Sequence, residues 1–241
     1  MAEIFVFIDF DDTLIDQIEL RSQYIAAVGQ LLRQDYGVDG KQMEPVVDRA
    51  LSESHNRYVE LFEKEPLAPF NTWLEKERAR IVETVFEDGG IAMPSGVPPS
   101  ELAKRLQFDA LIQTNAALQG AMECLQSLFE AGARTQIASA WDSDYLLAAL
   151  MGAGLESYTE SKFGPDLVDC AKESVEYYRR IFDAVGCRAE ESVVVDDSPA
   201  ALDWAEEAGA RVVQALTSPR AGDPEFPTVI RKLAELPQII K

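Results

Sequence analysis

The sequence predicts an α/β protein: a parallel sheet whose first strand is followed by an all-helical insertion. Short apolar runs without polar alternation, such as Ile4 to Ile8 and Ser192 to Val195, are typical of strands that are buried on both faces of a parallel sheet. After residue 114, helical and strand patterns alternate, which indicates strands joined by crossover helices. Between these two regions the pattern is helical throughout.

Four helices are expected in the insertion, because apolar residues recur there at helical spacing and Gly or Pro separates the runs. They should begin after Asp16, after Gln42, near Asn71 and at Ser100, whose side chain can cap the last helix. The chain is accordingly divided into a discontinuous α/β core domain, residues 1–16 and 114–241, and an α-helical cap domain, residues 17–113.

The second half of the chain should supply the remaining strands and their crossover helices. The expected elements are a helix over 118–130, a strand over 135–138, a helix from Ser143 or Asp144, an irregular segment or short strand over 163–169, a helix over 173–185, strands over 192–195 and 211–214 separated by a helix over 199–208, and a terminal helix over 228–239. An insertion at the carboxyl end of a central strand lies over the ligand crevice of such a sheet and can act as a lid.

The charge of the chain restricts the classes of partner. With 42 acidic and 22 basic residues, the net charge of -20 repels nucleic acid and anionic membranes, so neither is expected as a partner. A phosphorylated ligand would need local cations at its site. The chain lacks a membrane-length apolar run and a signal-peptide pattern, and a cytoplasmic protein is expected.

Three cysteines are present, at positions 124, 170 and 187. Their odd number and the absence of C-x-x-C spacing argue against a disulfide framework or a zinc site. We expect ordinary reduced thiols.

Acidic side chains cluster after two of the expected strands. Asp9, Asp11 and Asp12 follow the first strand, and Asp196 and Asp197 follow the strand that begins at residue 192. Open α/β sheets bind ligands at these strand ends, and crowded like charges cost stability unless a cation lies among them. A divalent metal is the simplest candidate, and a solvated acidic turn is the alternative.

Two further polar residues lie at or near strand ends. Ser139 follows the second strand, and Lys172 precedes a helix. Two carboxylates spaced one residue apart can serve as nucleophile and acid/base, an acidic pair can complete a metal site, and Ser and Lys can hold phosphate oxygens.

These segments, in this order and spacing, resemble the haloacid dehalogenase (HAD) superfamily, in its phosphatase branch with an α-helical (C1-type) cap. The resemblance covers essentially the whole chain and implies a Rossmann-like core. The matching residues are Asp9, Asp11 and Thr13 of a D-x-D-x-T motif, Ser139 of the second motif, Lys172 of the third, and Asp196 and Asp197 of an acidic pair followed by Ser-Pro.

The resemblance implies a role for each of these residues. Asp9 would attack phosphorus and form an aspartyl-phosphate, while Asp11 would protonate the leaving oxygen and then activate water. Mg²⁺ would be held by Asp9, the backbone carbonyl of Asp11 and Asp197, with Asp196 acting through a water. The phosphate-binding residues would be Thr13, Ser139 and Lys172.

The lysine of the third motif has a rival. Glu173 stands where relatives often have Pro, and Lys162 is the alternative lysine. Lys172 fits better because the following helix and Gly186 then fall in register.

The expected function is a Mg²⁺-dependent phosphatase that acts on a small phosphorylated metabolite, as a monomer or homodimer. Dehalogenases and phosphonatases of the superfamily lack the second acid, which this chain has at Asp11. A sugar-phosphate phosphomutase and a non-catalytic phosphate-binding protein remain alternatives.

Substrate specificity should belong to the cap. Its candidate residues, each of which could equally be a surface or packing residue, are Arg49, His55, Arg57, Tyr58, Trp73 and Arg78. The cap lysines expected to be solvated are Lys41, Lys64, Lys76 and Lys104.

Overall fold

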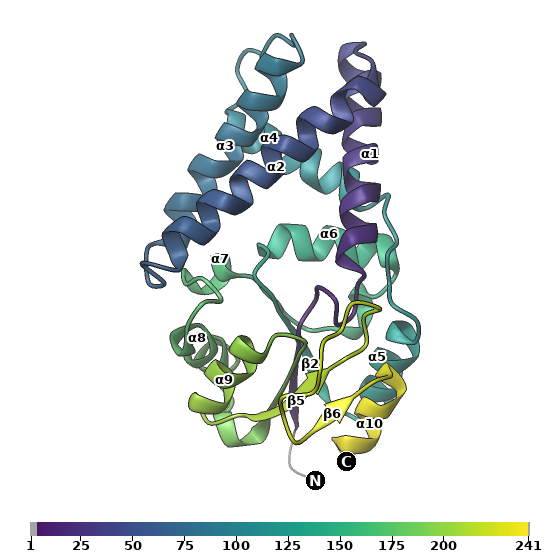
Figure 1. Cartoon of the computed structure of the whole chain (residues 1–241), viewed down its shortest axis with the longest axis vertical. Helices are drawn as coiled ribbons and strands as arrows, with labels where there is room; N and C mark the ends of the chain where they lie inside the picture. The colour runs from purple at the N-terminus through teal and green to yellow at the C-terminus, as the bar shows by residue number, and fades with distance from the viewer. Residues whose placement is uncertain (1–3, 241) are drawn as a thin grey trace.

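A six-stranded parallel sheet forms the core of the computed structural model, which describes residues 4–240 (Figure 1). Its strands are β1 (Phe5–Ile8), β2 (Arg134–Ala138), β3 (Lys162–Phe163), β4 (Ser192–Asp196), β5 (Arg211–Ala215) and β6 (Val229–Ile230). They lie in the order β3-β2-β1-β4-β5-β6, and every neighbouring pair is parallel. The strand order therefore reverses at β1, where open parallel sheets form their ligand crevice.

Both faces of β1 are covered. Val6 and Ile8 belong to one apolar cluster, and Phe5 and Phe7 belong to the other. The first cluster includes residues of α5 (Ala121–Glu130), α6 (Ser143–Ala153) and α10 (Leu236–Ile239), and the second includes residues of α8 (Val175–Val185) and α9 (Pro199–Glu207). This three-layer arrangement explains why the strand sequence is apolar without alternation.

Four helices form a cap over the carboxyl end of the sheet (Figure 1). They are α1 (Gln17–Tyr36), α2 (Gly40–Phe62), α3 (Phe70–Asp88) and α4 (Pro99–Leu111). Asp16 caps α1 by accepting hydrogen bonds from the N–H groups of Ile18 and Glu19, both at 3.1 Å. The helical insertion between β1 and β2 is thus confirmed, whereas the exact domain boundaries stay a prediction.

The terminal helix expected over 228–239 is wrong. Val229 and Ile230 form β6 against β5, and only a 3₁₀ turn (Leu233–Glu235) and α10 follow. Pairing with the free edge of β5 decides this segment, and tertiary pairing of this kind overrides a local helical pattern.

Several helix starts also differ from expectation. Ser100 lies inside α4, which begins after Pro98 without a side-chain cap. The helix expected from residue 118 begins at Ala121, after Gly120 takes the left-handed conformation at φ 88°. The helix expected from residue 173 begins at Val175. Between β3 and α8 lies one short helix, α7 (Pro165–Val168).

The cysteines are free thiols, two of them buried. Over residues 4–240, the helices are too short or too polar to cross a lipid bilayer.

Candidate active site

An ion-pair cluster lies at the carboxyl ends of the central strands. The ammonium of Lys172 lies 2.6 Å from Oδ1 of Asp9 and 2.7 Å from Oδ2 of Asp196, and it donates a hydrogen bond to the carbonyl oxygen of Ala138 at 2.9 Å. Asp9, Lys172 and Asp196 are all buried. The three groups around Lys172 come from the ends of β1, β2 and β4, which the sheet order places side by side.

Burial and crowding shift the pKa values of this cluster. Burial raises the pKa of Asp9 well above its usual range, although Lys172 opposes the shift. Burial and the neighbouring Asp196 raise the pKa of Asp197 to about 7. Burial acts to lower the pKa of Lys172, but Asp196 and Asp9 outweigh it and the pKa lies well above its usual value. The cluster thus contains three carboxylates, Asp9, Asp196 and Asp197, and a single lysine, so it has an excess of acidic groups.

Three carboxylates of the cluster could hold a metal ion. Asp9, Asp196 and Asp197 each offer an oxygen, and these oxygens lie within 4.8 Å of one another. A donor set made only of carboxylate oxygens suits Mg²⁺, and a divalent cation would balance the excess charge. The residues present therefore fit this ion. The side chain of Asp11 is not part of this group.

Asp11 lies beside the cluster in a separate hydrogen-bond network. Its Oδ2 accepts hydrogen bonds from the indole Nε1 of Trp141 at 2.5 Å and from the amide of Gln17 at 3.3 Å. Its Oδ1 is buried and has no hydrogen-bond partner among the described residues. Burial raises the pKa of Asp11 to about 6, against the opposing effect of the Trp141 bond. The group can therefore donate or accept a proton near neutral pH.

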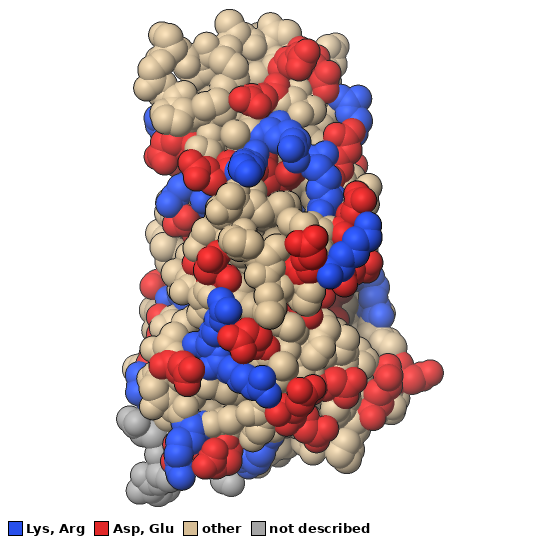
Figure 2. All heavy atoms as spheres, turned by 90° about the vertical axis from the view of Figure 1, so that its left-hand side faces the viewer, with Lys and Arg blue, Asp and Glu red and all other residues tan. Residues whose placement is uncertain are grey.

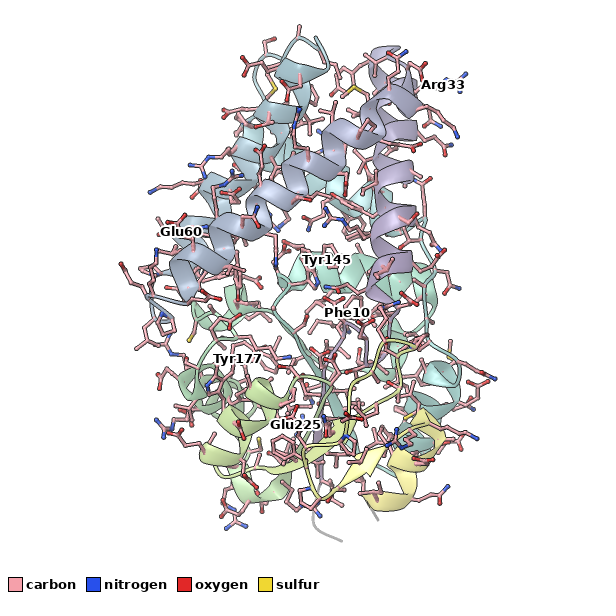
Figure 3. The ribbon with its side chains drawn as sticks, in the orientation of Figure 1. Phe10, Arg33, Glu60, Tyr145, Tyr177 and Glu225 are labelled. Atoms are coloured by element: carbon pink, nitrogen blue, oxygen red, sulfur yellow. The ribbon has the colours of Figure 1, made fainter. Side chains whose placement is uncertain are left out.

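Aromatic packing fixes the residues around Asp11. Phe10 is buried in the core, with its ring 6.3 Å from that of Tyr145 (Figure 3). Tyr145 in turn stacks on Trp141 at 4.2 Å, with the rings 9° from parallel. The anchored Phe10 and the stacked indole together hold the Asp11 loop in place.

Arg220 forms an ion pair with Asp12, a residue to which the sequence assigned no chemical role. Its guanidinium contacts Asp12 at 2.5 Å and Asp16 at 2.8 Å, and Thr217 donates to the carbonyl oxygens of Asp12 and Thr13. Asp12 has φ 53°, a left-handed conformation that Asp tolerates better than most residues. The loop after β5 therefore stabilises the segment that joins β1 to the first cap helix.

Sequence reasoning missed Arg220, Trp141 and Gln17. Arg220 lies in a loop without periodicity, about 200 residues from its partners, so no local signal could have identified it. Gln17 and Trp141 stand close to motif residues, and that proximity was the only available signal.

Ser139 and Thr13 are both buried at the strand ends. The Ser139 hydroxyl accepts a hydrogen bond from the backbone N–H of Trp141 at 3.3 Å. Tyr177, on α8, is labelled in Figure 3. Its hydroxyl donates to the carbonyl oxygens of Phe163 at 2.7 Å and Ser139 at 3.2 Å. The Thr13 hydroxyl is buried without a partner among the described residues.

Lys162 lies in a different environment from Lys172. Its ammonium donates to the carbonyl oxygen of Thr159 at 3.0 Å and lies 3.5 Å from the carboxylate of Glu156. The geometry therefore favours Lys172 as the lysine of the site.

The model of haloacid dehalogenase-like hydrolases matches residues 5–209 of the chain. The chain belongs to this family.

Solved structures of HAD proteins share the fold of the whole chain. The 2-haloacid dehalogenase from Pseudomonas syringae pv. Tomato DC3000 matches with a TM-score of 0.70 and 18% identity, covering 99% of this chain and 98% of the other. The magnesium-bound HAD-hydrolase YfnB from Bacillus subtilis matches with a TM-score of 0.62 and 19% identity, covering 100% of this chain and 99% of the other. The HAD phosphatase from Thermococcus onnurineus matches with a TM-score of 0.59 and 19% identity, covering 98% of this chain and 97% of the other.

No curated protein matches the chain by sequence. The solved HAD structures include dehalogenases and a phosphatase at similar levels of sequence identity. Their similarity therefore establishes the fold of this chain but does not distinguish between substrates.

Most of the candidate specificity residues in the cap of this HAD protein do not contact the core. Arg49 and Arg57 pair with Asp88 and Glu77, which are also cap residues, and His55 is exposed. Trp73 packs within an aromatic cluster of the cap.

Two of the candidate specificity residues, and one of the cap lysines expected to be solvated, do contact the core. Tyr58 donates to Glu173 at 3.1 Å, and Arg78 contacts Asp142 at 2.8 Å. Lys104 lies 2.7 Å from the carboxylate of Asp144, and its side chain is 42% exposed, so this lysine is solvent-accessible as expected and also forms an ion pair with the core.

Proposed function

We propose that the protein is a Mg²⁺-dependent phosphatase that hydrolyses a small phosphorylated metabolite through an aspartyl-phosphate on Asp9. The observation that best supports this is the state of Asp11. Its pKa is about 6, and its Oδ1 has no hydrogen-bond partner within residues 4–240, as suits a proton donor two residues from the nucleophile. An alkoxide leaving group needs that proton, whereas a departing halide does not.

In the first step, a carboxylate oxygen of Asp9 attacks phosphorus, and the bond from phosphorus to the leaving oxygen breaks as Asp11 gives that oxygen a proton. In the second step, Asp11 takes a proton from water as the water oxygen attacks phosphorus, and the Asp9 carboxylate leaves. Lys172 and Ser139 hold the transferring oxygens. When bound by Asp9, Asp196, Asp197 and the carbonyl of Asp11, Mg²⁺ would supply positive charge for the phosphoryl group.

Ionised Asp9 is a requirement of this reaction. Burial alone would favour the protonated acid, which is a poor nucleophile. The Lys172 ammonium at 2.6 Å opposes that shift and keeps a positive charge beside the attacking group.

The test is phosphate release from a panel of phosphorylated metabolites with and without Mg²⁺, alongside halide release from 2-haloacids. We expect Mg²⁺-dependent phosphate release. Asp9→Asn should abolish it, and Asp11→Asn should reduce it by about 10²–10⁴-fold, the usual contribution of general acid–base catalysis. The exposed Asp203→Asn serves as the control and should match the wild type.

Halide release without phosphate release, or wild-type turnover by Asp9→Asn, would contradict the proposal. An isomerised sugar phosphate in place of free phosphate would indicate the phosphomutase. Absence of both activities would favour a non-catalytic phosphate-binding protein.

A further inference from the structure

The cap contacts the segment that leads to Lys172. The backbone N–H of Asn71, at the start of α3, donates to Oδ1 of Asp169 at 2.8 Å, and its side-chain amide donates to the carbonyl oxygen of Asp166 at 3.0 Å. The hydroxyl of Tyr58, on α2, donates to Oε1 of Glu173 at 3.1 Å. These bonds join two cap helices to one stretch of eight residues, 166–173.

Aromatic side chains of the cap cover the same stretch. Ala171 is fully buried in a cluster with Phe62 and Phe70. The ring of Tyr58 lies 4.9 Å from that of Phe62 and 5.5 Å from that of Trp73, which fixes the direction of its hydroxyl. The cap therefore holds both neighbours of Lys172, Ala171 through packing and Glu173 through a hydrogen bond.

The backbone at Lys172 receives little support from regular structure. α7 ends at Val168, Asp169 has φ 46°, and α8 begins only at Val175. Many members of the family have a proline directly after this lysine. A proline there would stiffen the backbone, because it fixes its own φ and restricts the conformation of the residue before it. Glu173 imposes no such restriction. Arg180 of α8 donates to the carbonyl oxygens of Val168 and Asp169, both at 3.0 Å, and the two residues that flank Lys172 are held by the cap.

We propose that Tyr58 and Glu173 are positioning residues that hold Lys172 in its phosphate-binding place through the contact between the cap and the core. The ion pairs to Asp9 and Asp196 hold the ammonium, and the cap holds the backbone from which it extends. The contact between the cap and residues 166–173 and the binding of phosphoryl oxygens at Lys172 are thereby coupled. The inference rests on the proposed phosphatase function.

The first experiment measures turnover of p-nitrophenyl phosphate and its inhibition by inorganic phosphate, both with Mg²⁺. Tyr58→Phe and Glu173→Ala should each raise the inhibition constant of phosphate by up to about tenfold, the upper end of the usual contribution of one hydrogen bond. Glu173→Gln keeps an oxygen acceptor and should stay near the wild type. The double variant Tyr58→Phe/Glu173→Ala should lose no more than either single variant.

Tyr36→Phe provides the matched control. Tyr36 lies at the last residue of α1, with its ring 5.0 Å from Phe86 inside the cap, so this variant loses a cap hydroxyl that does not contact the core. It should leave the inhibition constant of phosphate unchanged.

The second experiment is amide hydrogen exchange on the whole protein, which needs no turnover. Residues 166–174 should exchange faster in Tyr58→Phe and Glu173→Ala than in the wild type, Glu173→Gln and Tyr36→Phe. Unchanged exchange in this segment would overturn the inference, and so would faster exchange with an unchanged inhibition constant. A wild-type protein that neither turns over nor binds phosphate would instead count against the proposed function, while the exchange result still decides whether the cap holds the segment.

Discussion

Asp11 shows how one side chain is adjusted by its neighbours. Burial raises its pKa to about 6, and the Trp141 indole limits that rise because its N–H bonds to the charged form. The same bond occupies Oδ2 and leaves Oδ1 for the reaction. Trp141 is in turn held by stacking on Tyr145. The proton-transfer group is thus set by an indole that no motif contains.

Trp141→Phe should shift the pH dependence of activity upward. The acid must be protonated to release the leaving group, so we expect activity to fall as pH rises above the pKa of Asp11. Loss of the indole N–H destabilises the carboxylate, which should move this decline up by about one pH unit, corresponding to about 1.4 kcal/mol. The measurement is kcat against pH with saturating Mg²⁺. A decline at the wild-type pH would show that Trp141 does not act on Asp11.

Substitution of the two rival lysines should separate their roles. Lys172→Met leaves Asp9 and Asp196 buried without their cation, which should lower the free energy of unfolding by about 3–5 kcal/mol. Phosphatase turnover, measured below the melting temperature of the variant, should fall by at least about 10²-fold. Lys162→Met is the control and should keep near-wild-type turnover, because the partners of its ammonium in the described part of the chain are Glu156 and backbone carbonyls, all outside the ion-pair cluster. The reverse pattern would assign the site to Lys162.

At the scale of elements, the cap depends on a close approach between α1 and α2. A Cβ atom at Gly29 would lie 2.7 Å from the carbonyl oxygen of Gly40, and one at Gly40 would lie 2.5 Å from that of Gly29. Both contacts are with backbone, which cannot move aside as a side chain can. The two helices therefore pack this closely only because both positions lack a side chain.

Gly29→Ala should force the helices apart and lower the free energy of unfolding by about 1–3 kcal/mol, the usual cost of overpacking. Alanine favours the helix more than glycine does, so any loss reflects the contact rather than helix propensity. Urea unfolding followed by circular dichroism measures the change. Gly222→Ala, at an open position, is the control. Equal stability of the two variants would mean that the helix pair adapts.

For the molecule as a whole, the charge of -20 makes the local cations important. On the face drawn in Figure 2, Lys and Arg side chains lie among Asp and Glu side chains. Surface cations such as Arg188 pair with neighbouring acids. Under the proposed function, Lys172 and a bound Mg²⁺ together would have to attract the anionic substrate, since the overall field repels it.

The order of elements follows from the sequence to a large extent. Uninterrupted apolar strands, alternation of helix and strand, and a purely helical stretch after β1 predicted the parallel sheet and its cap, because hydrophobic periodicity records which faces are buried. The family follows as well, because its motif residues stand next to strand ends and are readable locally. The 228–239 segment was misjudged because its fate depends on the free edge of β5, which lies outside any local window.

The sequence by itself determined the candidate reactive residues, which are Asp9, Asp11, Asp196, Asp197 and Lys172 with Lys162 as its rival. Only the tertiary structure decided how they are held. Lys172 between two carboxylates, Trp141 on Asp11, Arg220 on Asp12 and Tyr58 on Glu173 are contacts across many residues of chain. Local pattern specifies an element and its buried face, whereas such pairs exist only after distant elements have packed together.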